Sequence, residues 1–246
     1  PAADAAFYDE PSFFQRLLLK DWAFAAIMLL ATVVSFWRYQ TAMDVYEQGI
    51  LLGVLPAAVA LGWFWRPAAN LMVGGGAVAL LAIWLYQTPE GADLARADQV
   101  FLLKYFISSQ SAILWMCVLF FMSTAFYWLG MVVSKSADTM ELLGSRLAWT
   151  AVVLAVVGML VRWYEGHQMG PDIGHIPVSN LYEVFVLFCW LTATFYLYYE
   201  SHYQTRTMGA FVMLVVSAGV AFLLWYTLVR EAQAIQPLVP ALQSWW

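Results

Sequence analysis

Three histidines carry most of the chemistry that this sequence could perform, because an imidazole nitrogen can bind a metal ion or transfer a proton. His167 and His175 stand eight residues apart in the segment EGHQMGPDIGHIP, and His202 lies in YYESHYQTR. Two histidines on one loop could share a metal ion. Their loop offers mainly glycine and proline, however, and no residue that would orient the imidazoles. The pair therefore gives only a weak indication of a metal site.

Asn180 and Glu183 form a second group, within residues 174–183 (GHIPVSNLYE). Asn180 precedes an apolar run and has a side chain typical of a helix N-cap, while Glu183 is placed to reach back as in a capping box. A carboxylate there also faces the positive end of the helix dipole. At the border of an apolar run, however, a charge is expensive and often functional. Both interpretations stay open: a helix cap, and support for a functional site.

The elements that position these residues follow from composition. The chain of 246 residues is 63% hydrophobic and 11% charged, and its mean hydropathy is +0.71. Such a chain cannot bury its apolar surface in one water-soluble core. A bilayer core takes about 20 helical residues, and helices pair their backbone groups internally. Seven runs approach that length: residues 22–37, 49–65, 71–86, 112–133, 147–163, 181–199 and 208–228. We predict an all-α, polytopic integral membrane protein.

The distribution of lysine and arginine gives only a small bias for the orientation of the chain in the membrane. Lysines and arginines in the predicted loops divide six to five between the two sides, with the slight excess on the side of the N-terminus. The positive-inside rule then predicts a cytoplasmic N-terminus and an external loop at residues 164–180. Arg162 counts in this division on the external side, and Glu165 is one of the acidic residues that lean to that side but count for little in this rule.

Two further segments are open to more than one interpretation. Residues 91–110 mix apolar and charged side chains, which fits either an interfacial amphipathic helix or a helix packed across the protein's own external face. The run Gly74, Gly75, Gly76 favours close helix approach over phosphate binding, because the lysine of a phosphate loop is missing.

Several functional classes are disfavoured. A net charge of −5, with cations scattered singly, argues against a nucleic-acid partner. Cys117 and Cys189 lie inside apolar runs without CxxC or CxxCH spacing, so we interpret them as buried apolar residues. An ion transporter would carry charges near the middle of its spans, and these runs have essentially none. A structural membrane subunit that binds a partner remains an alternative.

Residues 174–183, the aromatic-rich run after them and the closing segment PLVPALQSWW resemble the CcsA/ResC family of system II cytochrome c biogenesis, some members of which are named CcsB. The resemblance covers residues 146–246. Matching positions are Gly174, His175, Pro177, Ser179, Asn180, Tyr182, Glu183, Pro237, Pro240, Gln243 and Ser244.

The resemblance implies a haem-handling protein of the bacterial cytoplasmic membrane. Its cargo would be b-type haem, and its partners the second system II membrane subunit (CcsB/ResB-type) and apocytochrome c with its CxxCH motif. Haem would be attached outside the membrane by this synthase complex, of which the chain would be a component without an identifiable catalytic residue. The haem-handling proteins of system I are a related alternative.

In that family an external histidine, a tryptophan-rich motif and further histidines follow the PALQS segment. None of them is present here, so we expect the chain to stop before the haem ligands. We expect residues 1–140 to form an amino-terminal membrane region and residues 141–246 to begin the cytochrome c assembly domain. Within the latter, residues 174–183 are predicted to brace a haem site, with His175 or Tyr182 supplying a hydrogen bond.

Overall fold

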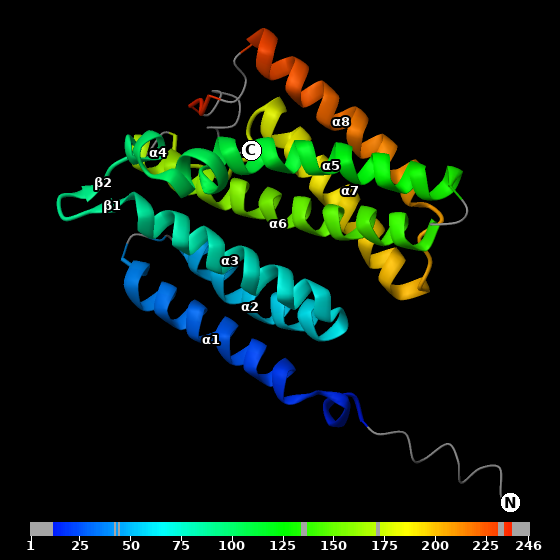
Figure 1. Ribbon diagram of the computed structural model, residues 1–246. Helices are drawn as coiled ribbons and strands as arrows, with labels where there is room; N and C mark the ends of the chain where they lie inside the picture. The colour runs from blue at the N-terminus through cyan, green and yellow to red at the C-terminus, as the bar shows by residue number, and fades with distance from the viewer. Residues whose placement is uncertain are drawn as a thin grey trace, which may run out of the picture. The chain divides into compact units, whose positions relative to one another are not determined.

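The computed structural model describes residues 12–41, 43, 45–133, 137–170, 173–230 and 234–237, and these are almost entirely helical (Figure 1). In chain order the elements are η2 (Phe13–Arg16), α1 (Leu19–Tyr39), α2 (Val45–Phe64), α3 (Arg66–Tyr86), β1 (Gln87–Thr88), β2 (Gly91–Ala92), α4 (Arg96–Gln99), η3 (Leu103–Ile107), α5 (Ser109–Val132), α6 (Ala137–Met169), α7 (Leu181–Tyr203) and α8 (Gly209–Arg230). The predicted all-α class is confirmed.

Each predicted apolar run lies within one helix, to within one residue at its ends. Six of these helices, α1, α3, α5, α6, α7 and α8, are long and apolar enough to cross a bilayer. The seventh, α2, contains the shorter apolar stretch Gln48–Phe64. Large apolar side chains are exposed on all seven helices, as expected of surfaces that face lipid. The chain is a multi-pass membrane protein.

The chain divides into two compact units, Pro1–Val73 and Gly74–Trp246. In the first, α1 and α2 form a helical hairpin. The Arg66 guanidinium pairs with the Asp21 carboxylate at 2.9 Å, and the Trp63 indole donates to the Asp21 carbonyl oxygen at 2.9 Å. The predicted division after residue 140 concerns family relationship and stays a prediction. The compact units divide elsewhere, and α5 and α6 lie in the same one.

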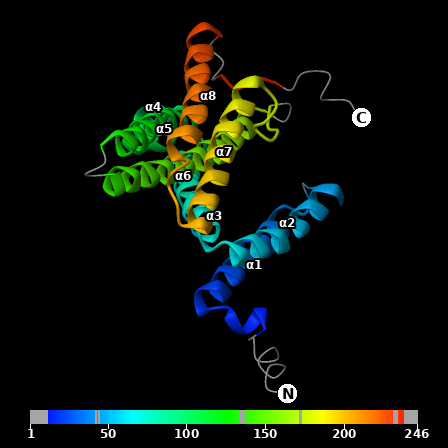
Figure 2. The ribbon, with the colours of Figure 1, turned by 90° about the vertical axis from the view of Figure 1, so that its right-hand side faces the viewer.

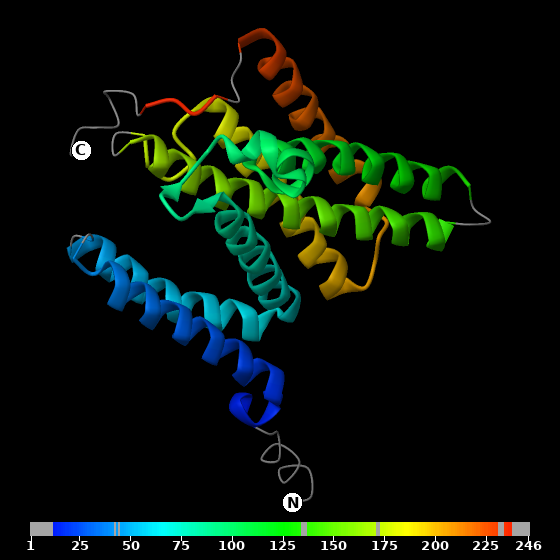
Figure 3. The same cartoon turned by 60° about the vertical axis from the view of Figure 1, so that its left-hand side comes forward.

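The second unit is built on α5 and α6, which run side by side (Figures 1 and 3). Small residues allow their close approach, as at Gly158, where an added Cβ would lie 2.8 Å from Ile113 Cγ1. Helices α7 and α8 pack against each other, and α8 also packs against α5 (Figure 2). Helix α6 contacts α5, α7 and α8, so its buried face sets the arrangement of this unit.

The carboxyl-terminal part of α3 packs on α6 in the same unit. Of the three consecutive glycines, Gly75 is buried, and an added Cβ there would lie 3.1 Å from Val156 Cγ1. Gly74 and Gly76 meet no described atom within 4 Å. Close packing is therefore confirmed for Gly75 alone.

We expect Gly75→Leu to destabilise the unit by about 1–3 kcal/mol, because the larger side chain must displace Val156. Gly74→Leu is the matched control, since it gains the same helix propensity in open space. Apparent melting temperatures in mild detergent measure both. Equal melting temperatures for the two variants would contradict the packing role of Gly75.

Residues 87–108 do not form one helix. The short hairpin of β1 and β2 pairs Thr88 with Gly91, and α4 and η3 follow as two separate short helices. Leu103 and Ile107 of η3 are buried against Ala82 and Tyr86 of α3 and Val161 of α6. The segment thus packs on the protein through one side, as one of the two predicted alternatives requires, while its aromatic residues stay exposed.

Candidate functional site at the start of helix α7

Asn180 begins α7 as its N-cap, as predicted. Its backbone is extended (φ −123°, ψ 165°), and its side-chain oxygen accepts from the backbone N–H of Glu183 at 2.9 Å. This bond satisfies one of the N–H groups that the first turn of a helix leaves unpaired. Leu181, the first residue of α7, is therefore placed by the asparagine that precedes it.

Glu183 does not close the predicted capping box. Its carboxylate reaches one residue farther back than Asn180, where Oε2 accepts from the Ser179 backbone N–H at 2.9 Å and from the Ser179 hydroxyl at 3.1 Å. The loop before the helix is therefore fastened to the first turn of α7. The other oxygen, Oε1, stays available for a different partner.

That partner is Arg162, from the last turns of α6. Its Nε donates to Glu183 Oε1 at 2.8 Å, and the two side chains are only 1% and 2% exposed. The guanidinium also lies 5.3 Å from the centre of the Tyr182 ring. Such a pair repays the cost of desolvation only when both charges find further polar partners. Glu183 has Ser179 and the positive end of the α7 dipole.

Arg162 has a further partner after α8. Its Nη2 donates to the Ala234 carbonyl oxygen at 3.2 Å. Close by in sequence, the Gln236 carbonyl oxygen lies 3.4 Å from His175 Nε2. The 174–183 loop and the segment 234–237 are thus in contact, and this segment includes the exposed Pro237. The other predicted positions beyond it, Pro240, Gln243 and Ser244, lie outside the described residues.

Two predicted loop positions are buried and one histidine is half-buried. Gly174 and Pro177 are buried, and an added Cβ at Gly174 would overlap the His167 ring. Gly174 is thus packed over the end of α6. His175 Nδ1 lies 3.1 Å from the Ile176 carbonyl oxygen, and Nε2 lies 3.5 Å from the Ser179 hydroxyl. Tyr182 is buried and contributes its ring to Arg162.

The three histidines do not meet a common metal site. His167 is exposed and stacks on Trp163, while His202 is exposed and stacks on Tyr198 near the other end of α7. Within the described ranges, no three His, Cys, Asp or Glu side chains are grouped as metal ligands. The Nδ1 atom of His175 lies near the Ile176 carbonyl oxygen, and its Nε2 atom lies near the Gln236 carbonyl oxygen and the Ser179 hydroxyl.

Sequence reasoning counted Arg162 and Glu165 only by the side of the membrane on which they would lie, and missed that both are buried side chains of α6. Glu165 Oε1 accepts from the Tyr86 hydroxyl at 2.7 Å and the Ser109 N–H at 3.2 Å, and Oε2 accepts from the Ser109 hydroxyl at 2.5 Å. Ser109 opens α5, so this carboxylate caps a neighbouring helix. The spacing of Val157, Val161 and Glu165 by four residues is the signal that could have found it.

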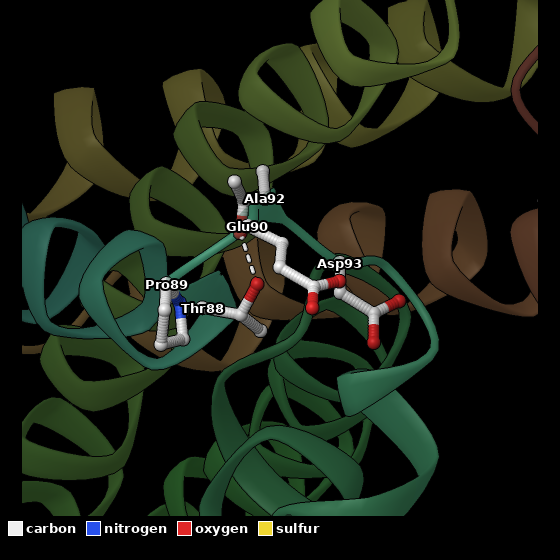
Figure 4. Close-up of a pocket in the computed structure, with 6 residues that line it drawn as sticks. Thr88, Pro89, Glu90, Ala92 and Asp93 are labelled. Atoms are coloured by element: carbon white, nitrogen blue, oxygen red, sulfur yellow. Dashed lines mark hydrogen bonds between the residues drawn. The ribbon is translucent and has the colours of Figure 1, made fainter.

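A surface pocket lies elsewhere, on the hairpin between α3 and α4. It is lined by residues 88–93, including Glu90 and Asp93, and the Thr88 hydroxyl donates across it to the Gly91 carbonyl oxygen at 2.7 Å (Figure 4). None of its residues belongs to the 174–183 loop. With two acidic side chains and a single turn of backbone, it does not match a flat, apolar porphyrin.

Several curated relatives of this chain are described as cytochrome c biogenesis protein CcsA. The protein of Chlorella vulgaris is 30% identical over 129 residues, which is 52% of this chain and 38% of the relative. The protein of Gloeobacter violaceus is 35% identical over 125 residues (50% and 34%), and that of Trichormus variabilis 32% over 126 residues (51% and 33%).

No protein-family model and no solved structure matches the chain. The matched stretch spans about a third of the length of these curated relatives. The predicted resemblance is nevertheless confirmed by several relatives: about half of this membrane-spanning chain is similar in sequence to the CcsA cytochrome c biogenesis proteins.

Proposed function

We propose that this chain is part of a system II cytochrome c synthase that presents haem for covalent attachment to apocytochrome c. The similarity to CcsA proteins supports a role in cytochrome c biogenesis. The observation that supports the specific role in haem presentation is a contact. The 174–183 loop and the segment 234–237 are connected through Arg162 and His175. Arg162 and the loop thereby contact residues 234 and 236, which directly precede the second segment that resembles the family.

In this proposal the loop and the end of α6 act as a brace. Asn180 and Glu183 fix the start of α7, and Arg162 ties that start to the chain that leaves α8. Residues 234 and 236, which lead into the second family-like segment, are thereby tied to the end of α6 and to the loop. Haem itself would be held by residues beyond this brace, as cargo of the complex.

The chemistry asks for orientation more than for a protein nucleophile. Each thioether bond forms when a cysteine S–H adds across a haem vinyl group, so no leaving group departs. What the protein must supply is the mutual placement of porphyrin and CxxCH peptide. A rigid brace next to the porphyrin serves that need.

Further parts of the proposal concern place and partners. We assign the chain to a bacterial cytoplasmic membrane, with the loop at residues 164–180 on the outer side, where haem attachment occurs in system II. Its partners would be a CcsB/ResB-type membrane subunit and apocytochrome c. Labelling of a cysteine placed at Gln168, which is exposed at the end of α6, by a membrane-impermeant maleimide tests the orientation.

We expect His175→Ala, in the native full-length protein, to lower the yield of holocytochrome c several-fold at unchanged protein level. The reason is that the loop loses its contact with Gln236 while the helix cap stays intact. Haem staining in a host without its own maturation system measures the yield. His202→Ala removes an exposed histidine at the other end of α7 and serves as control.

The absorption spectrum of co-purified haem separates bracing from ligation. A brace leaves the Soret and α/β bands of His175→Ala at their wild-type positions, whereas loss of an axial ligand shifts them. A wild-type yield at wild-type protein level would count against any role of His175 in haem presentation and would favour a purely structural subunit.

A further inference from the structure

The segment between α3 and α5 has two distinct sides. Leu103 is fully buried and Ile107 is 7% exposed, and both pack in the core formed with α3 and α6. On the other side Phe101 is 66% exposed, Tyr105 51% and Phe106 40%. Aromatic rings of this size are rarely left to water in such a group.

These rings form one fixed cluster with Trp115 of α5. The centre of the Phe101 ring lies 5.2 Å from that of Tyr105 and 6.0 Å from that of Phe106, and Phe106 stacks on Trp115 at 5.9 Å. The Trp115 indole N–H donates to the Tyr105 carbonyl oxygen at 2.7 Å. The cluster is therefore held in place by the start of α5 and does not depend on a partner for its shape.

The position of this aromatic cluster relative to the spanning helices indicates that lipid covers it. α3 ends at Tyr86 and α5 begins at Ser109, so the segment lies where two membrane spans reach the surface. Trp115 is six residues into α5, about 9 Å from its start. Trp84, two residues before the end of α3, is also exposed. Tryptophan and tyrosine concentrate at this level, between acyl chains and headgroups.

We propose that Phe101, Tyr105, Phe106 and Trp115 form an interfacial anchor that inserts into the lipid headgroup–acyl boundary. Lys104 is exposed, and its amine lies 5.8 Å from the Tyr105 ring centre, so the amine can reach the headgroup layer from an inserted cluster, as lysine does at interfaces. The anchor fixes the depth of η3 and so of Ser109, the residue that opens α5.

Local charge indicates the kind of lipid. The segment that carries the cluster contains the cations Arg96 and Lys104 and the acidic residues Glu90, Asp93 and Asp98. Arg96 Nε donates to the Leu85 carbonyl oxygen at 2.6 Å. The segment has no excess of positive charge to attract anionic headgroups. Zwitterionic phosphatidylcholine should therefore suffice for insertion, and added phosphatidylglycerol should change it little.

Spin labels at single cysteines test the anchor. Cys117 and Cys189 are buried and are replaced by alanine, and labels are placed at Phe101→Cys, Tyr105→Cys and, as matched control, the exposed Asp98→Cys. The full chain is reconstituted in phosphatidylcholine vesicles with and without phosphatidylglycerol. Power saturation then compares collisions of each label with oxygen, which partitions into lipid, and with a water-soluble nickel chelate.

We expect the oxygen-to-nickel collision ratio at positions 101 and 105 to exceed that at position 98 several-fold in both lipid mixtures. Nickel collisions at 101 and 105 as frequent as at 98 would place the segment in water and overturn the proposal. Low collision rates with both reagents would show that protein covers the cluster, which also overturns it. Wild-type helix content by circular dichroism confirms that the labelled chains are folded.

Discussion

Replacing Arg162 with alanine is expected to reduce holocytochrome c to the background of a strain that lacks the protein. The substitution leaves the Glu183 carboxylate buried without its cation, and breaking a buried pair in this way costs about 3–5 kcal/mol. It also releases the Ala234 carbonyl oxygen, which Arg162 holds at 3.2 Å. Haem staining measures the yield, and immunoblotting of membranes measures protein level.

Arg206→Ala is the matched control at the opposite end of α7. Arg206 also pairs with a buried carboxylate, Glu200, at 3.1 Å, but its own side chain is 37% exposed. Water screens such a pair, so its loss costs roughly 0–1 kcal/mol. Glu200 also keeps the hydrogen bond that it accepts from the Tyr127 hydroxyl. We expect near-normal yield from this variant.

A double variant separates structure from function. Arg162→Met combined with Glu183→Met removes both charges and leaves apolar side chains of similar length, which is often tolerated better than either single loss. We expect protein level to recover and holocytochrome c to stay low, because the tie to Ala234 is still missing. If the double variant restores both, the pair only stabilises the fold and the brace hypothesis is wrong.

Most of the fold could be predicted because the requirements that lipid imposes on a spanning segment can be recognised directly along the sequence. A spanning helix needs a long apolar run, and all seven predicted runs are helices. The ends of the helices were harder to predict from the sequence. The run at residues 147–163 is only the apolar middle of α6, which has 33 residues and is about 50 Å long. Helical turns beyond the hydrocarbon core carry charges, so hydropathy does not reveal them.

Only the local part of the candidate site, the start of α7, could be predicted from the sequence. The cap formed by Asn180 depends on residues three positions apart, and such local patterns can be seen in a sequence. The partner of Glu183 is 21 residues away on another helix, and the contact of His175 with Gln236 spans 61 residues. These pairings depend on how α6, α7 and α8 pack, which no local pattern encodes.

Glu165 differs from Glu183 in the way its charge is stabilised. In the part of the chain that the structure describes, no cation lies within ion-pair distance of Glu165, and three donors from Tyr86 and Ser109 bind its carboxylate instead. One of them is the first N–H of α5, at the positive end of that helix. The side chain thereby joins the ends of α3, α5 and α6 through hydrogen bonds alone.

Glu165→Ala is therefore expected to destabilise the second unit by about 2–5 kcal/mol, because it orphans the buried Tyr86 hydroxyl and the Ser109 donors at about 1–3 kcal/mol for each group. Glu165→Gln, which keeps one acceptor oxygen, should cost less, and Tyr86→Phe, which removes only one donor, should cost about 1 kcal/mol. Apparent melting temperatures in mild detergent rank the stabilities of these variants.

Glu90→Ala, on the exposed hairpin turn, is the control and should leave the melting temperature unchanged. If Glu165→Ala melts like Glu90→Ala, the three hydrogen bonds contribute nothing to stability, and the carboxylate must be maintained for a role other than joining these helices.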